Sequence, residues 1–151
     1  MLSMRTAGFI LAGMILPALT GCGNDAKLAV TPVQGEILFQ KKDGKTIPMA
    51  GARVIFHPTF EESKFPAFPV GKVKEDGSFS LGTYASEDGA PEGNYVVTVI
   101  WKKPKALKFD FFVKNAEGED LLKGAYADAK RSSLRVKIQA GTAVKILVPQ
   151  P

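Results

Sequence analysis

From Pro32 to the C-terminus, apolar and polar residues alternate with a period of two, and this alternation most constrains the fold. A period of two places every second side chain on one face of an extended strand, whereas a helix needs apolar residues three or four apart. The alternation is complete in residues 134–139, where Leu134, Val136 and Ile138 stand against Arg135 and Lys137. No segment carries an apolar stripe of helical spacing over ten or more residues. The chain is therefore expected to be all-β.

Seven segments show this alternation or a short apolar run: residues 33–39, 52–58, 70–74, 78–83, 95–101, 134–139 and 144–148. Glycine-containing turn signals separate several of them, at Asp43-Gly44, Asp76-Gly77 and Ala140-Gly141. Residues 95–101 are apolar on both faces, which is typical of a strand in the middle of a sheet. The pattern predicts a seven-stranded Greek-key β-sandwich, immunoglobulin-like in its strand pattern, with a barrel as the alternative. Residues 102–130 give the weakest pattern; Phe109, Phe111 and Val113 fit an edge strand, and residues 120–123 fit a helical turn.

The N-terminus has the features of an export signal. Arg5 precedes an apolar run over residues 9–16, which is too short to cross about 30 Å of hydrocarbon as a helix. Leu19, Thr20, Gly21 and Cys22 then match a lipobox, in which an aliphatic residue and two small residues precede a cysteine. We expect cleavage before Cys22 and acylation of its thiol with palmitate-type chains; the alternative is an ordinary secretory peptide that contains a cysteine.

This interpretation divides the chain into three parts. Residues 1–21 form the lipoprotein signal peptide, residues 22–31 a lipidated tether, and residues 32–151 the folded domain. Cys22 is the only cysteine, so the chain forms no internal disulfide. Gly23 replaces the aspartate that retains many lipoproteins in the inner membrane. We therefore expect a membrane-anchored protein at the outer membrane or the periplasmic face of the envelope, with the lipid bilayer as its first partner.

The folded part resembles a known family of β-domains. Residues 33–37, Asp43-Gly44-Lys45, residues 50–56, the Asp76-Gly77-Ser78-Phe79 turn and the Gly93-Asn94-Tyr95 strand start are similar to the carboxypeptidase regulatory-like domain. The resemblance extends to small bacterial lipoproteins of this type, in which a Tyr126-Ala127-Asp128 and Ser132-Ser133-Leu134 pattern precedes the last hairpin. It implies a transthyretin-like (prealbumin-like) seven-stranded fold and no particular activity.

The residues that carry enzyme or metal chemistry elsewhere are sparse in this chain. His57 is the only histidine and is expected to be a solvent-facing strand residue. Glu75, Asp76, Glu87 and Asp88 lack the spacing of a calcium loop, so solvated turns are favoured over a hard-cation site. No nucleophile motif is present. We expect no enzyme activity, no catalytic residue, no metal and no cofactor.

Aromatic residues provide the candidate binding surface. Phe60, Phe65 and Phe68 lie among prolines, and they either form an exposed recognition patch or pack over the open end of the sandwich. Trp101 ends the strongest strand and precedes a basic run of Lys102, Lys103, Lys105 and Lys108. This run either contacts anionic head groups or polymers, or keeps an edge soluble. The net charge of +5 is scattered, so nucleic acid is not an expected partner.

Two functional hypotheses follow. The first is a non-enzymatic envelope lipoprotein that acts as a binding or structural module. The second is a carbohydrate- or peptide-binding accessory subunit of an envelope enzyme or transport complex, which uses Trp101 or the loop at residues 60–68. The candidate partners besides the bilayer are an envelope protein and a polysaccharide.

Overall fold

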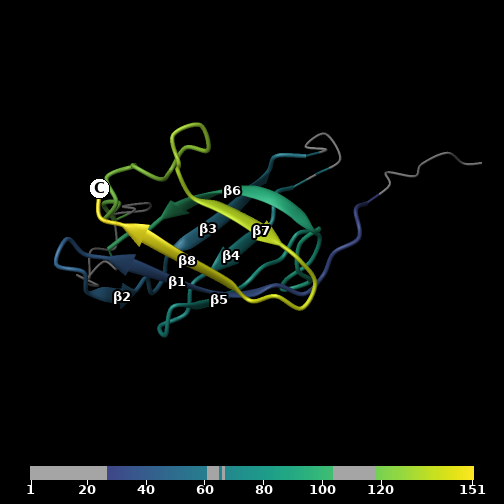
Figure 1. Cartoon of the computed structure of the whole chain (residues 1–151), viewed down its shortest axis with the longest axis horizontal. Coiled ribbons are helices and arrows are strands. Elements are labelled where there is room, and N and C mark those ends of the chain that lie inside the picture. The colour runs from purple at the N-terminus through teal and green to yellow at the C-terminus, as the bar shows by residue number, and fades with distance from the viewer. Residues whose placement is uncertain (1–26, 61–64, 66, 104–117) are drawn as a thin grey trace, which may run out of the picture.

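A computed structural model describes residues 27–60, 65, 67–103 and 118–151, and these residues form an all-β sandwich of two four-stranded sheets (Figure 1). The strands are β1 (Gln34–Gln40), β2 (Thr46–Pro48), β3 (Arg53–Pro58), β4 (Val70–Lys72), β5 (Ser78–Ser80), β6 (Gly93–Ile100), β7 (Arg135–Ile138) and β8 (Val144–Pro149). The expected all-β sandwich is thereby confirmed. Among the described residues, no helix is long and apolar enough to span a membrane.

The first sheet is organised around β1. Along one edge β1 pairs antiparallel with β5 through its first half and with β2 through its second half. Along the other edge it pairs with β8 in a parallel register, from Gly35 opposite Val144 to Gln40 opposite Pro149. The first and last strands of the domain therefore lie side by side and run in the same direction.

The second sheet has the strand order β4-β3-β6-β7, and all its pairs are antiparallel. Tyr95, Val97 and Val99 of β6 are fully buried, and Thr98 on the opposite face is only 3% exposed. The prediction of a central strand at residues 95–101 is therefore confirmed, because β6 lies between β3 and β7.

The core lies between the two sheets. Every second residue of β3 and of β8 points into it, as the alternation predicts. At one edge the sheets meet through two backbone hydrogen bonds between Val70 and Gly82. The largest fully buried side chains come from strands of both sheets and from the segments that follow or connect them: Tyr95, Phe56, Phe79, Ile37 and Ile138 lie in strands, and Met49, Leu81 and Leu122 lie outside them. Phe56 packs against both Phe79 and Tyr95, with ring centroids 6.1 and 5.9 Å apart.

The strand count of seven is wrong for this chain, because the described residues contain eight strands. All seven predicted segments contain a strand, and the eighth is β2, a three-residue edge strand that ends in Pro48. It forms because the turn at residues 41–45 folds it back on β1, with hydrogen bonds from Lys41 N to Lys45 O and from Gly44 N to Lys41 O. Greek-key connectivity stays a prediction. The segment with Phe109, Phe111 and Val113 lies outside the described residues.

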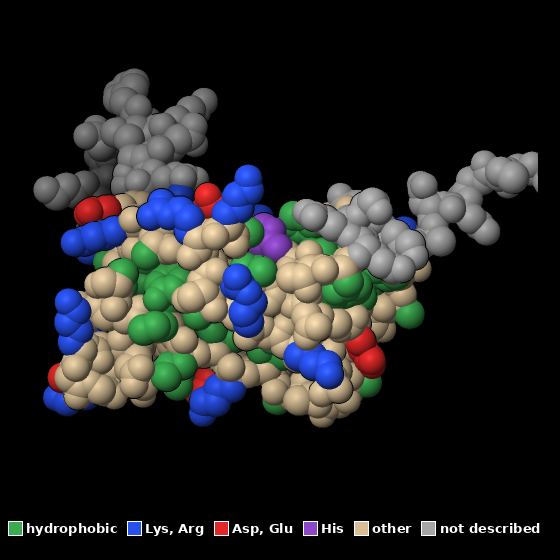
Figure 2. All heavy atoms as spheres, turned by 45° about the horizontal axis from the view of Figure 1, so that its top comes forward, with side chains coloured by type: hydrophobic (Ala, Val, Ile, Leu, Met, Phe, Trp, Pro, Cys, Tyr) green, Lys and Arg blue, Asp and Glu red, His purple; other side chains and the backbone are tan. Residues whose placement is uncertain are grey.

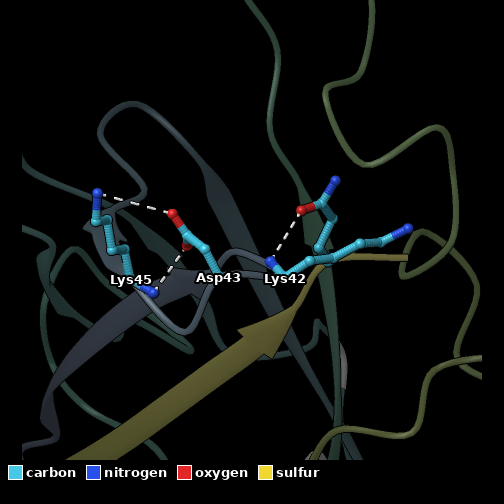
Figure 3. A network of polar contacts seen from close by, with 4 residues as sticks. Lys42, Asp43 and Lys45 are labelled. Atoms are coloured by element: carbon cyan, nitrogen blue, oxygen red, sulfur yellow. Dashed lines mark hydrogen bonds and ion pairs between the residues drawn. The ribbon is translucent and has the colours of Figure 1, made fainter.

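The two ends of the described chain lie at opposite ends of the sandwich. The described chain enters at one end, where Thr31 pairs with Ala90, and the C-terminus lies at the other end (Figure 1). We call these the entry end and the far end. At the far end the β1–β2 turn is held by Asp43, which accepts a hydrogen bond from Lys45 N, while Lys42 N donates to Gln150 Oε1 (Figure 3).

Candidate functional site

The lipobox residues Leu19, Thr20, Gly21 and Cys22 lie outside the described residues. The first described contacts of the chain are made by Lys27 and Leu28, which both reach Tyr84. The Lys27 ammonium lies 5.3 Å from the centre of the Tyr84 ring, and Leu28 N donates a 3.0 Å hydrogen bond to the Tyr84 hydroxyl. Lys27 and Leu28 thus contact the loop between β5 and β6.

The carboxylate of Asp88 organises that loop. It accepts backbone hydrogen bonds from Thr83 N at 2.6 Å, Tyr84 N at 3.1 Å and Ala85 N at 3.0 Å. Partial burial raises the pKa of Asp88, and the three backbone hydrogen bonds together outweigh that effect, so its pKa lies below the usual 3.8. Asp88 therefore stabilises the loop that Lys27 and Leu28 contact.

Asp76 has a comparable local role. It accepts hydrogen bonds from the Ser78 hydroxyl at 2.6 Å and from Ser78 N at 2.9 Å, which hold the pKa of Asp76 below its usual value. Across the described part of the chain, no three His, Cys, Asp or Glu side chains are grouped so as to hold a metal ion. The hydrogen bonds from Ser78 show that Asp76 stabilises the turn before β5.

Phe60 and Phe65 pack at the entry end against Tyr95. The Phe60 ring lies 5.7 Å from Phe65 and 5.5 Å from Tyr95, edge to face in both pairs, and Phe65 is only 8% exposed. These two residues follow the second of the two sequence interpretations, packing over the end of the sandwich. Of these two side chains, only the half-exposed Phe60 offers surface to a ligand.

Phe68 lies over the outer face of the second sheet. Its ring is 4.9 Å from that of His57, and His57 Nε2 lies 3.0 Å from the Thr98 hydroxyl oxygen. His57 is half-buried on the outer face of β3, so it faces away from the core as predicted, and the neighbouring Phe68 ring covers part of it.

Trp101 occupies the far end, at the end of β6. Its ring lies 5.5 Å from Phe39, and its indole N–H donates a 3.0 Å hydrogen bond to the Ala50 carbonyl. Asp120 accepts a hydrogen bond from Trp101 N at 3.1 Å and further ones from Leu122 N and Gly124 N. These turns replace the expected helical turn at residues 120–123.

The structure does not bring the four predicted surface residues together. The length of β6 separates Trp101 from Phe60 by roughly 20 Å, since each strand residue advances the chain about 3.3 Å. Lys105 and Lys108 of the basic run lie outside the described residues. A single ligand site formed by Trp101 and the three phenylalanines is therefore excluded by the geometry.

The Tyr126 and Ser132 motifs that precede the last hairpin have structural roles. The Tyr126 hydroxyl donates to the Pro149 carbonyl at 3.0 Å, which ties the segment to β8. The Ser132 hydroxyl donates to the Val97 carbonyl at 2.5 Å and accepts from Leu134 N. Both residues connect the segment before β7 to the two sheets.

Sequence reasoning missed one feature of the surface, the collective charge of the outer face of the second sheet. Directly paired strand residues share a face, so the registers place Lys72 beside Arg53 and Arg135 beside Val96 on this face. Its strand residues are Val70, Lys72, Arg53, Ile55, His57, Asn94, Val96, Thr98, Ile100, Arg135 and Lys137. Four are basic and none is acidic. The alternation predicted each basic residue to face outward, but not that they share one face.

Comparisons with family models, with curated proteins and with solved structures find no match to this chain.

Proposed function

We propose that this chain is a bacterial envelope lipoprotein that is held to a bilayer by acyl chains on Cys22. Its β-sandwich serves as a non-enzymatic binding or structural module at the outer membrane or the periplasmic face. The observation that carries the proposal is the Leu19-Thr20-Gly21-Cys22 sequence directly after a short apolar run and Arg5. Two or three acyl chains anchor a protein durably, whereas one does so only marginally.

The position of the domain relative to Cys22 supports this proposal. Five residues separate Cys22 from Leu28, the first residue with a hydrogen bond to the loop between β5 and β6. Fully extended, this stretch reaches about 20 Å. An acylated Cys22 would therefore keep the sandwich next to the membrane surface.

Membership of the carboxypeptidase regulatory-like, transthyretin-like family is part of the proposal. The Tyr95 hydroxyl bonds the Pro91 carbonyl four residues earlier, an arrangement known from Greek-key sandwiches as a tyrosine corner. Gly51 and Gly77, both in the motifs of the resemblance, have φ angles of 78° and 88°, as tight turns require. These features support a Greek-key sandwich of this type.

Replacement of Cys22 tests the anchor. The Cys22→Ala variant should lose labelling by a palmitate analogue and leave the membrane fraction, whereas Asn24→Ala, two residues further along, should keep both properties. Mass spectrometry of the N-terminal peptide should show a diacylglyceryl cysteine at the mature N-terminus. A free thiol on Cys22 in the wild-type protein would refute the proposal.

A second candidate, a carbohydrate-binding accessory subunit, is favoured by Trp101. This half-exposed indole is fixed by Phe39 and by the hydrogen bond to Ala50, so a ligand stacking on it would find a rigid surface. Trp101 is the only tryptophan, so the intrinsic fluorescence of the protein reports on this site alone. Titration with envelope polysaccharide should shift the emission if the candidate is correct. An unchanged spectrum, together with an unchanged melting temperature, would dismiss it.

A further inference from the structure

We propose that the outer face of the β4-β3-β6-β7 sheet binds the anionic surface of a phospholipid bilayer. The inference rests on the proposed function only for the nearness of that membrane. We call this surface the basic face and define it by the eleven strand residues given above. Figure 2 shows Lys and Arg side chains spaced apart across a view that includes the single His.

The outer faces of the two sheets differ in net charge. The basic face has four cations and no carboxylate among its strand residues. On the outer face of the other sheet the charged strand residues are Glu36 and Lys145, and they form a 3.2 Å ion pair with each other. One sheet is therefore neutral on its outer face and the other carries four positive charges.

The four cations are spread across the whole width and length of the sheet. Lys72 and Lys137 lie on the two outermost strands and near opposite ends of the sheet. With strands about 4.8 Å apart and residues about 3.3 Å apart, their Cα atoms are separated by about 25 Å. A single small anion cannot contact both, but a planar anionic surface can contact all four cations at once.

The residues between the cations fit the same partner. Ile55, Val96 and Ile100 lie half-buried along the middle of the face; Thr98 among them is only 3% exposed, and the Phe68 ring covers part of His57. Aliphatic side chains between two pairs of cations, one pair near each end of the sheet, suit the boundary between head groups and acyl chains, where lysine and arginine keep their charged ends among the phosphates. Among the described residues, Arg53, Lys72 and Lys137 form no ion pair that would compete with lipid phosphate.

Vesicle binding of the unacylated protein tests the proposal separately from the anchor. The mature chain from residue 22 with Cys22→Ser keeps every strand and every described core residue. It should sediment with phosphatidylcholine vesicles that contain phosphatidylglycerol, and not with pure phosphatidylcholine. Binding should weaken as salt is raised above about 0.1 M, where the screening length is about 10 Å. Because this variant carries no acyl chain, its binding or failure to bind tests only the basic face. The acylation of Cys22 is tested separately, by labelling and mass spectrometry.

Two double variants with equal loss of charge locate the surface. Each basic residue near an anionic leaflet contributes a factor of about five to the partition coefficient, so Lys72→Gln/Lys137→Gln should reduce binding about twenty-five-fold. Lys41→Gln/Lys42→Gln, on the β1–β2 turn, should reduce it less than about threefold at equal melting temperature. Equal reductions in the two variants would overturn the proposal. Binding to dextran sulfate without binding to the anionic vesicles would overturn it as well and would point to a polysaccharide.

Discussion

The hydroxyl of Tyr95 donates a 2.7 Å hydrogen bond to the carbonyl oxygen of Pro91, and both groups are buried. The bond fixes the turn that leads from the loop between β5 and β6 into β6, a central strand of the second sheet. It connects the conformation of the entry end to the centre of the core.

Removal of this hydroxyl should destabilise the fold without disturbing the packing. Tyr95→Phe leaves the Pro91 carbonyl buried without its donor, and we expect the free energy of unfolding to fall by about 1–2 kcal/mol. Tyr126→Phe removes a less buried hydroxyl from the Pro149 carbonyl and should cost about 0.5–1 kcal/mol. Urea denaturation of both variants measures the difference. A larger loss for Tyr126→Phe would contradict the central role of Tyr95.

Stability should also fall at alkaline pH. Burial raises the pKa of Tyr95 well above its ordinary value of 10.0, with a smaller contribution from Tyr84. The folded state therefore holds the phenolic proton more tightly than the unfolded state. Its contribution is complete below about pH 10 and is lost as the pH rises above that value, because the unfolded chain releases the proton first. Urea denaturation at about pH 8 and about pH 11 should show a steeper loss for the wild type than for Tyr95→Phe.

Asp88 should make the entry end sensitive to acid. Its pKa is lowered in the fold, so its contribution is present above the usual value of 3.8 and is lost as the pH falls below it. Asp88→Ala removes the acceptor of three backbone hydrogen bonds and should cost about 1–3 kcal/mol at neutral pH. Glu75→Ala, at an exposed turn position, should change stability by less than about 0.5 kcal/mol. If both variants unfold at the same urea concentration, Asp88 does not hold the loop.

Gly93 should not tolerate a side chain. A Cβ atom at this position would lie 2.2 Å from the Phe60 ring, and the φ angle of 149° already disfavours any other residue. We expect Gly93→Ala to cost about 2–4 kcal/mol, from overpacking added to backbone strain. Gly141→Ala has open space and a φ angle of 73°, so it should cost only about 1–2 kcal/mol. Similar losses in the two variants would mean that Phe60 moves aside freely.

The residue after Cys22 should direct the protein between membranes. If Gly23 permits transfer to the outer membrane, then Gly23→Asp should retain the acylated protein in the inner membrane. Separation of the two membranes on a density gradient measures this shift, and Asn24→Asp supplies a control with the same added charge. An unchanged distribution of Gly23→Asp would show that this position does not sort the protein.

The alternation of side chains predicted which residues face the core but not which strands are neighbours. Residues 144–148 were correctly assigned to a strand with Val144, Ile146 and Val148 inward, because the period of two needs only local sequence. The parallel pairing of β8 with β1 joins segments more than a hundred residues apart, and no local pattern encodes it. The short strand β2 was missed for the same reason, since its pairing with β1 defines it.

The candidate sites were predicted to a lesser extent. The Asp76-Gly77 turn followed from its residues, because glycine readily adopts the positive φ that the turn requires. The sequence named Trp101 and the loop at residues 60–68 as alternative binding surfaces, and the structure places Trp101 and Phe60 at opposite ends of β6. Conversely, Lys72 and Lys137 are far apart in the sequence and share a face only through the pairing of four strands.

The parallel pairing of β1 and β8 also determines how the domain responds to mechanical load. A pull between Leu28 and Pro151 acts on β1 at the entry end and on β8 at the far end, along the strand direction. The hydrogen bonds between the two strands then bear the force together and must break together, in shear. A load applied between the two ends of the domain would thus meet the stiffest direction of the sandwich.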